Sequence, residues 1–223
     1  MNLTDGSRCS CGRHVLLGEG PGPLGYTIGP ATGLREAWHR GRREYLAWLF
    51  AIDAMTVIVR ARESVAQLGA LVEPSSDDRL HVTVLVNGFP DELPLGLRAA
   101  QIRAVEEARL RAPLVRVHGP AVSFVSLHLA VCDCNDGIGA LRRALLGASG
   151  ALGHREPRES PYAAHVTAGN VTDSVCGKVL HDALASLTDA SPIELRLTHL
   201  RLVALDTRSY NEPWKTIDEI VLT

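Results

Sequence analysis

A three-residue signature that occurs twice constrains the fold of this chain more than any other feature. The triplet His-Val-Thr stands at His81–Thr83 and again at His165–Thr167. Each copy lies in a segment whose apolar and polar residues alternate, residues 80–86 and 162–169, which is typical of β-strands with one buried face. Each is also the third element of a repeated β-α-β-α-β pattern, so the sequence predicts an internally duplicated α+β fold.

The remaining elements follow from the spacing of apolar residues along the chain. Helices are expected after Asp53, which would serve as an N-cap, and at about 95–111, 138–145 and 175–187. Gly119-Pro120 is interpreted as a turn between two strands, and a change of phase near His199 as a bulge within one long strand. The further strands are expected at 45–52, 114–118, 122–132, 193–202 and 214–222.

The first 44 residues differ in composition from the rest. They contain nine of the 20 glycines and three of the 12 prolines, which is unfavourable for a regular helix or a central strand. We expect a Gly/Pro-rich extension over 1–44, followed by one domain over 45–223. Within the extension Cys9, Cys11 and His14 are too few ligands for a closed zinc site, so free thiols are expected.

Charge and hydropathy exclude several classes of protein. The net charge is -2, with 23 Lys+Arg against 25 Asp+Glu, which argues against a protein that coats nucleic acid through a basic face. Neither a run of about 18 apolar residues nor a signal peptide is apparent. The odd number of cysteines, five, suits a reducing compartment. We expect a cytoplasmic monomer that does not associate with membranes.

The two triplets predict a site for one phosphate. Side chains at i and i+2 of a strand lie on the same face, about 6–7 Å apart. If the two halves pack about a pseudo-twofold axis, His81 and Thr83 converge with His165 and Thr167 on one phosphorus from opposite sides. In-line displacement requires a base on one side and an acid on the other, and histidine can take either role near neutral pH. The threonines would donate to the non-bridging oxygens, and no metal or cofactor is required.

The motifs resemble those of a known superfamily. Leu80-His-Val-Thr-Val-Leu-Val-Asn-Gly88 and Ala164-His-Val-Thr-Ala168 are similar to the paired His-x-Thr-x motifs of the 2H phosphoesterases, which include RNA 2′,3′-cyclic phosphodiesterases and 2′-5′ RNA ligase-like proteins. The resemblance implies a bilobal fold with a central groove between two antiparallel sheets. We expect the lobes to comprise about 45–120 and 121–223.

The same resemblance implies a function in RNA processing. It identifies a hydrolase of 2′,3′-cyclic phosphates on a nucleotide or a short RNA end. It also implies that His81 is the acid that protonates the leaving ribose oxygen and that His165 is the base that activates water. Two alternatives remain open: hydrolysis of another small phosphodiester, such as a cyclic dinucleotide or a 2′-5′ oligonucleotide, and a catalytically idle nucleotide-binding module.

Residues near the motifs are candidates for substrate contacts. Phe89 and Tyr162 are expected to stack on a base, and Arg155 and Arg158 to contact a second phosphate or a sugar. His128 and His199 are interpreted as ordinary packed residues. Ligase-like members commonly have Leu-Ala-Arg after the second motif, whereas this chain has Ala168-Gly169-Asn170, so it lacks that arginine.

Overall fold

The computed structural model describes residues 27–28, 40–122, 126–157, 162–172, 175–188, 191–207 and 213–223. Most of the expected extension over 1–44, including Cys9, Cys11 and His14, lies outside these residues. The described part contains four α-helices, a nine-stranded antiparallel sheet and a two-stranded sheet. The α+β class predicted from the sequence is confirmed, and the large sheet is open at both edges.

The large sheet has the strand order β11-β10-β2-β4-β7-β6-β5-β9, with β3 paired to β7 outside this path. A separate two-stranded sheet pairs β1 (Thr27–Ile28) with β8 (Val175–Cys176). The strands of the large sheet are β2 (Glu44–Ala51), β3 (Val72–Pro74), β4 (His81–Gly88), β5 (Leu114–Val122), β6 (Ser126–Asp133), β7 (His165–Val171), β9 (Ile193–Arg196), β10 (His199–Asp206) and β11 (Lys215–Val221).

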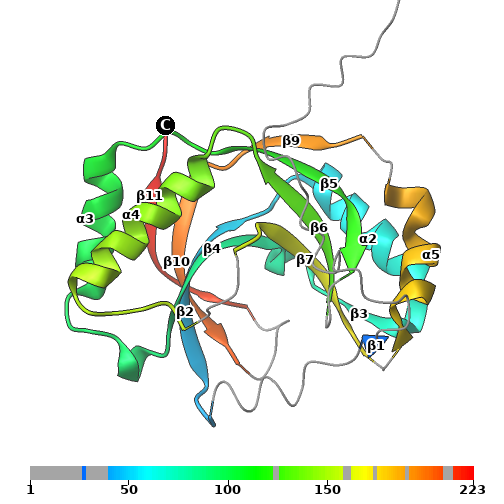
Figure 1. Cartoon of the computed structure of the whole chain (residues 1–223), viewed down its shortest axis with the longest axis horizontal. Coiled ribbons are helices and arrows are strands. Elements are labelled where there is room, and N and C mark those ends of the chain that lie inside the picture. The colour runs from blue at the N-terminus through cyan, green and yellow to red at the C-terminus, as the bar shows by residue number, and fades with distance from the viewer. Residues whose placement is uncertain are drawn as a thin grey trace, which may run out of the picture.

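The helices lie in two pairs at opposite ends of the sheet (Figure 1). One pair comprises α3 (Leu97–Ala108) and α4 (Gly137–Ala151), and the other comprises α2 (Met55–Leu68) and α5 (Gly177–Thr188). None of the helices among the described residues is long and apolar enough to span a membrane. Short 3-10 helices are η1 (Gly69–Leu71), η2 (Asp77–Arg79) and η3 (Pro90–Glu92).

The sheet consists of two antiparallel halves that meet between β4 and β7. Among the described residues these strands share one register pair, Val82 with Val166, whereas neighbouring strands within each half share four or more. One half is β11-β10-β2-β4 and the other is β7-β6-β5-β9. The two expected sheets are therefore joined into one continuous sheet by a narrow junction.

The two spatial halves do not follow the order of the chain. Strand β5 follows α3 in sequence but pairs with β6, and β10 follows the second motif but pairs with β2. The helices are exchanged as well, because α2 packs against β7 and α5 whereas α4 packs against β4 and α3. The expected lobe boundary near residue 120 therefore differs from the boundary in space, which lies between β4 and β7.

Three local expectations are wrong. Gly119-Pro120 is not a turn, since strand β5 continues through it and its register with β6 shifts there. The proline is tolerated because a residue at a bulge does not need to donate a ladder hydrogen bond. The long strand expected at 193–202 is two strands on opposite halves of the sheet, interrupted at Leu197 and Thr198. Helix α2 begins at Met55 with Ala54 at its N-cap, so Asp53 does not cap it.

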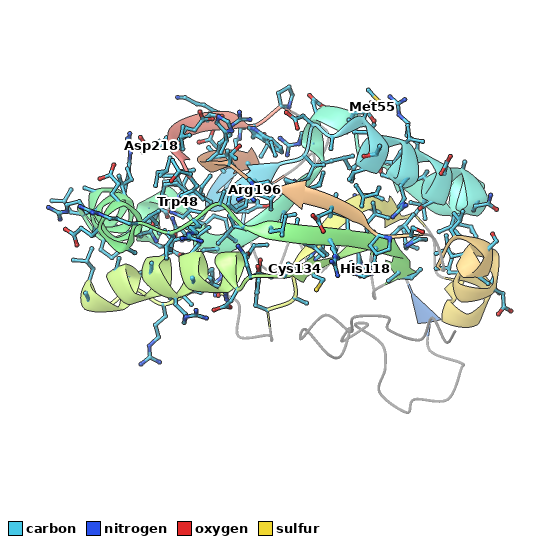
Figure 2. All side chains as sticks on the ribbon, turned by 90° about the horizontal axis from the view of Figure 1, so that it is seen from above. Trp48, Met55, His118, Cys134, Arg196 and Asp218 are labelled. Carbon is cyan, nitrogen blue, oxygen red and sulfur yellow. The ribbon has the colours of Figure 1, made fainter. Side chains whose placement is uncertain are left out.

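A buried polar network ties the first half of the sheet to its helices. Trp48 on β2, which is labelled in Figure 2, has no exposed surface. Its indole N–H donates to Oε1 of Gln101 on α3 over 2.7 Å. The Gln101 amide nitrogen donates in turn to Oδ1 of Asn87 on β4 and to Oγ of Ser149 on α4. Because each buried polar group has a partner, the network fixes β2, β4, α3 and α4 relative to one another.

One cysteine differs from the expectation of reduced thiols. Cys132, near the end of β6, is 3% exposed and takes part in a disulfide bond.

Candidate active site

Both His-Val-Thr triplets begin a strand at the junction between the two halves. His81 is the first residue of β4 and His165 is the first residue of β7. Because Val82 pairs with Val166 in antiparallel register, His81 faces Thr167 and His165 faces Thr83. The two valines are fully buried in the main core, so the histidines and threonines alternate onto the other face.

The register gives the dimensions of this site. Directly opposed side chains on antiparallel strands have Cβ atoms about 5 Å apart, and diagonal neighbours are about 7–8 Å apart. The two histidines occupy one diagonal and the two threonines the other. The structure therefore brings together all four residues proposed from the sequence, in an arrangement that is the size of one phosphate group.

The hydrogen bonds of the two histidines are equivalent. Nδ1 of His81 lies 2.6 Å from the carbonyl oxygen of Arg79, and Nδ1 of His165 lies 2.8 Å from the carbonyl oxygen of Ala163. A carbonyl oxygen only accepts, so Nδ1 carries the proton and donates in both rings. In the neutral form the ring lone pair of each histidine then lies on Nε2, the atom that takes or returns a proton in acid–base catalysis.

The surroundings of His81 are cationic and aromatic. Trp214 makes an edge contact with the ring of His81, with centroids 5.5 Å apart, and the Arg79 guanidinium lies 4.7 Å above the indole. Burial lowers the pKa of His81 to about 4, and the charges of Arg79 and His165 act in the same direction. His81 is therefore neutral at pH 7 in the protein without substrate.

The surroundings of His165 contain a third histidine. His128 on β6 is 4% exposed, and its ring centroid lies 5.2 Å from that of His165 at an interplanar angle of 55°. Burial, followed by the charge of His165, lowers the pKa of His128 to about 4. No motif includes His128, so its sequence context predicts an ordinary packed residue, and only the pairing of β6 with β7 brings it to the site.

Phe89, expected to stack on a substrate base, is buried away from the four motif residues. It is 3% exposed and belongs to a second apolar cluster that includes Tyr45 and Val86. The guanidinium of Arg42 lies 4.8 Å from the centre of its ring. The side chain therefore has a packing role in this structure. Of the two arginines expected to contact the substrate, Arg155 is exposed and Arg158 lies outside the described residues.

Tyr162, in contrast, is connected to the first motif. Its hydroxyl donates to the carbonyl oxygen of Thr83 over 2.7 Å, and the residue is 37% exposed. Arg142 on α4 stacks 4.4 Å from the Tyr162 ring centre and donates to the carbonyl oxygen of Val84 over 2.8 Å. Arg142 also forms an ion pair with Glu156, which accepts from the Val86 backbone N–H, so the chain before β7 is attached to β4 at several points.

A cavity lies next to two neighbours of His81, although none of the four motif residues lines it. Its volume is about 470 Å³, and its lining includes Trp214, which touches His81, and Ala51, which pairs with His81 across β2 and β4. Polar groups at its wall are Asp53, Asp77, Asp78 and Arg201. Within the described part of the chain, no cluster of three histidine, cysteine or acidic residues is placed to hold a metal ion.

Comparison with known proteins decides the family. The sequence matches the 2′-5′ RNA ligase superfamily over residues 56–208, which is more than half of the chain. The chain belongs to this superfamily. It is accordingly a 2H phosphoesterase family member, as the paired motifs predicted. A search of the curated proteins finds no match.

Solved structures of the superfamily share the fold at low sequence identity. TT0787 of Thermus thermophilus is 17% identical with a TM-score of 0.60, and the match covers 80% of this chain and 97% of that one. E. coli LigT complexed with 3′-AMP is 14% identical with a TM-score of 0.60, covering 82% and 99%. The MHV ns2 PDE domain is 11% identical with a TM-score of 0.52, covering 74% and 99%.

Proposed function

We propose that this 2H family member hydrolyses 2′,3′-cyclic phosphates of nucleotides or short RNA ends without a metal ion. The observation that carries the proposal is the junction of β4 and β7, where two histidines with equivalent Nδ1–H donors share one face with two threonines. Such a site has one histidine on each side of a phosphorus to act as acid or base, and a threonine hydroxyl beside each histidine to donate a hydrogen bond.

The reaction assigns one proton transfer to each histidine. Nε2 of His165 takes a proton from water as its oxygen bonds to phosphorus. The bond from phosphorus to one ribose oxygen breaks, and Nε2 of His81 gives that oxygen a proton. Thr83 and Thr167 donate to the non-bridging oxygens, where negative charge increases in the transition state. The product is a phosphomonoester, and a proton passing from His165 through solvent to His81 restores the starting state.

The acid role of His81 requires that substrate binding change its protonation. The pKa of His81 is about 4 in the free protein, so the ring is neutral at pH 7. An anionic phosphate placed between the histidines favours the imidazolium form because opposite charges within about 4–6 Å stabilise each other. Binding of the phosphate thus leads to protonation of His81, and the leaving oxygen later receives this proton.

For the nucleoside we propose the cavity beside Trp214. Trp214, which contacts His81, forms the aromatic wall of this cavity and suits a base, while the carboxylates of the cavity suit hydroxyl or amino donors. LigT, a solved structure with this fold, has been crystallised with 3′-AMP, with NADP+ and with ATP, which supports a nucleotide as the ligand class. In this proposal Trp214, and not the buried Phe89, stacks on the base.

The test is hydrolysis of 2′,3′-cyclic mononucleotides and short cyclic-phosphate RNAs in EDTA. We expect turnover by the wild type and a loss of roughly 10²- to 10⁴-fold in kcat/KM for His81→Ala and for His165→Ala. His199→Ala, which removes an exposed histidine on β10, serves as the matched control and should keep full activity. Turnover that survives both motif substitutions, or that requires a divalent metal, contradicts the mechanism.

One observation favours a second substrate class. Ligase-like members have an arginine where this chain has Asn170, and Gly169 beside it is in close contact with β3. A different small phosphodiester, such as a cyclic dinucleotide or a 2′-5′ oligonucleotide, therefore remains the alternative for the same acid–base site. Including both in the substrate panel separates the two, since the preferred class will have the higher kcat/KM.

A further inference from the structure

The duplicated halves correspond residue by residue around the site. Strand β2 pairs with β4 as β6 pairs with β7, and both pairings shift register at the same place. In the first half Trp48, Leu49, Phe50 and Ala51 face Leu85, Thr83, Val82 and His81. In the second half Leu127, His128, Leu129 and Ala130 face Gly169, Thr167, Val166 and His165.

The chemical character of these equivalent positions is conserved between the halves except beside the threonines. Leu49 lies opposite Thr83 and is fully buried, whereas its counterpart His128 lies opposite Thr167 and is 4% exposed. An imidazole in a buried position is less favourable than a leucine unless its ring has a specific use. The fold does not require histidine there, since the same bulged position accepts leucine in the other half.

His128 is on the same face as the catalytic pair. A directly opposed residue shares the face of its partner, so His128 extends the face that carries Thr167 and His81. Its ring is tilted against the ring of His165, with centroids 5.2 Å apart. On the other side of the site the ring next to His81 belongs to Trp214, 5.5 Å away. Among the described residues each motif histidine therefore contacts an aromatic ring, and the two rings differ.

We propose, building on the phosphoesterase function above, that His128 is a positioning residue that holds the ring of His165 in its catalytic orientation. The hydrogen bond from Nδ1 to the Ala163 carbonyl oxygen anchors one edge of the His165 ring. Contact with the buried His128 ring restricts rotation about that anchor, so that Nε2 stays directed at the phosphate. Orientation of a reacting group to within about 1 Å is worth up to roughly 100-fold in rate.

The protonation of His128 is consistent with this role. Its pKa of about 4 leaves it uncharged at pH 7, so it adds no repulsion when His165 accepts a proton from water. The ionisable group that lowers this pKa by its charge is His165 itself. A neutral ring thus supports its neighbour by contact without competing for the proton.

The test compares two substitutions with different predictions. His128→Leu installs the residue of the equivalent position and removes the ring, whereas His128→Phe retains a ring. Imidazole ¹⁵N shifts at pH 7.5 report the tautomer of His165 without any substrate. We expect the Nδ1–H tautomer to dominate in the wild type and in His128→Phe, and a mixture of tautomers in His128→Leu.

Activity on the cyclic phosphates supplies the second readout. We expect kcat to fall roughly 10- to 100-fold in His128→Leu with KM nearly unchanged, and to recover in His128→Phe. Thermal unfolding confirms that both variants are folded. A folded His128→Leu protein with the wild-type tautomer and the wild-type kcat overturns the proposal. If the wild type hydrolyses no phosphodiester, the proposed function fails, while the tautomer comparison still decides the role of His128.

Discussion

Val82 pairs with Val166 across β4 and β7, and both valines are fully buried beneath the site. This pair determines the register of the two motifs. Because side chains alternate along each strand, fixing the valines toward the core directs His81, Thr83, His165 and Thr167 to the other face. A shift of one residue between the strands would turn the histidine and the threonine of the shifted strand into the core, so the active-site geometry depends directly on this contact.

Anion binding to the site should depend on pH through His81. Sulfate keeps its double charge between pH 7 and 4, which makes it a suitable phosphate analogue. The pKa of His81 is about 4 in the free protein and rises when an anion binds, so binding takes up a proton. The affinity should therefore increase as the pH falls from 7 toward 4, by at most about tenfold per unit. Isothermal titration calorimetry with His81→Gln as the control measures this, and an equal slope in both proteins contradicts it.

The free energy of unfolding should also depend on pH through His128. Its pKa in the folded protein, about 4, lies below the ordinary 6.5, so the unfolded chain binds more protons between these values. The lowered pKa of His128 contributes at most about 3 kcal/mol to the free energy of unfolding. This contribution is fully present above pH 6.5 and is lost as the pH falls toward 4. Urea titrations at pH 7, 6, 5 and 4.5 should show a shallower decline for His128→Leu than for the wild type.

Tyr162→Phe should weaken the connection between the second motif and β4. The substitution removes the hydroxyl that donates to the Thr83 carbonyl oxygen and leaves the ring stacked on Arg142. We expect a loss of about 1 kcal/mol in the free energy of unfolding and an increase in KM, since the backbone of Thr83 loses a fixed partner. Urea unfolding and steady-state kinetics check both effects, and unchanged values in both would show that the hydroxyl bond is unimportant.

Gly169→Ala should destabilise the fold where β3 meets β7. A Cβ at this position would lie 2.5 Å from Cγ1 of Val72 and 2.6 Å from the carbonyl oxygen of Glu73. Because the second contact is with backbone, the strands must separate, at a cost of about 1–3 kcal/mol. Gly147→Ala on α4 is the matched control, since a Cβ there meets nothing within 4 Å and helix propensity predicts a gain of about 0.5–1 kcal/mol.

The motif residues could be predicted from the sequence because their signal is local. Alternation within residues 80–86 and 162–169 places each His and Thr on a polar face without knowledge of any partner strand. The duplication then indicates that the two faces meet. Thus the four residues at the centre of the site, and the family to which they belong, were accessible before the structure.

The neighbours of the motif histidines could not be predicted in the same way. Trp214 and His128 reach the site through a loop contact and a strand pairing, and no spacing in the chain indicates them. Phe89 was misassigned for the complementary reason. It follows the first motif closely in sequence, yet the apolar cluster with Tyr45 and Val86 buries it. Proximity along the chain beyond the end of β4 therefore does not place Phe89 at the site.

Because β5 and β10 are exchanged between the halves, each half of the sheet contains strands from both copies of the repeat. A fragment ending at β5 would present the edge of β2 without β10 and would carry a β5 without β6. Exposed strand edges of this kind favour aggregation. Neither copy of the repeat is therefore an independent module, although the repeat is internally symmetric. The two halves should unfold in one cooperative transition, and fragments expressed separately should recover the fold only when both are combined.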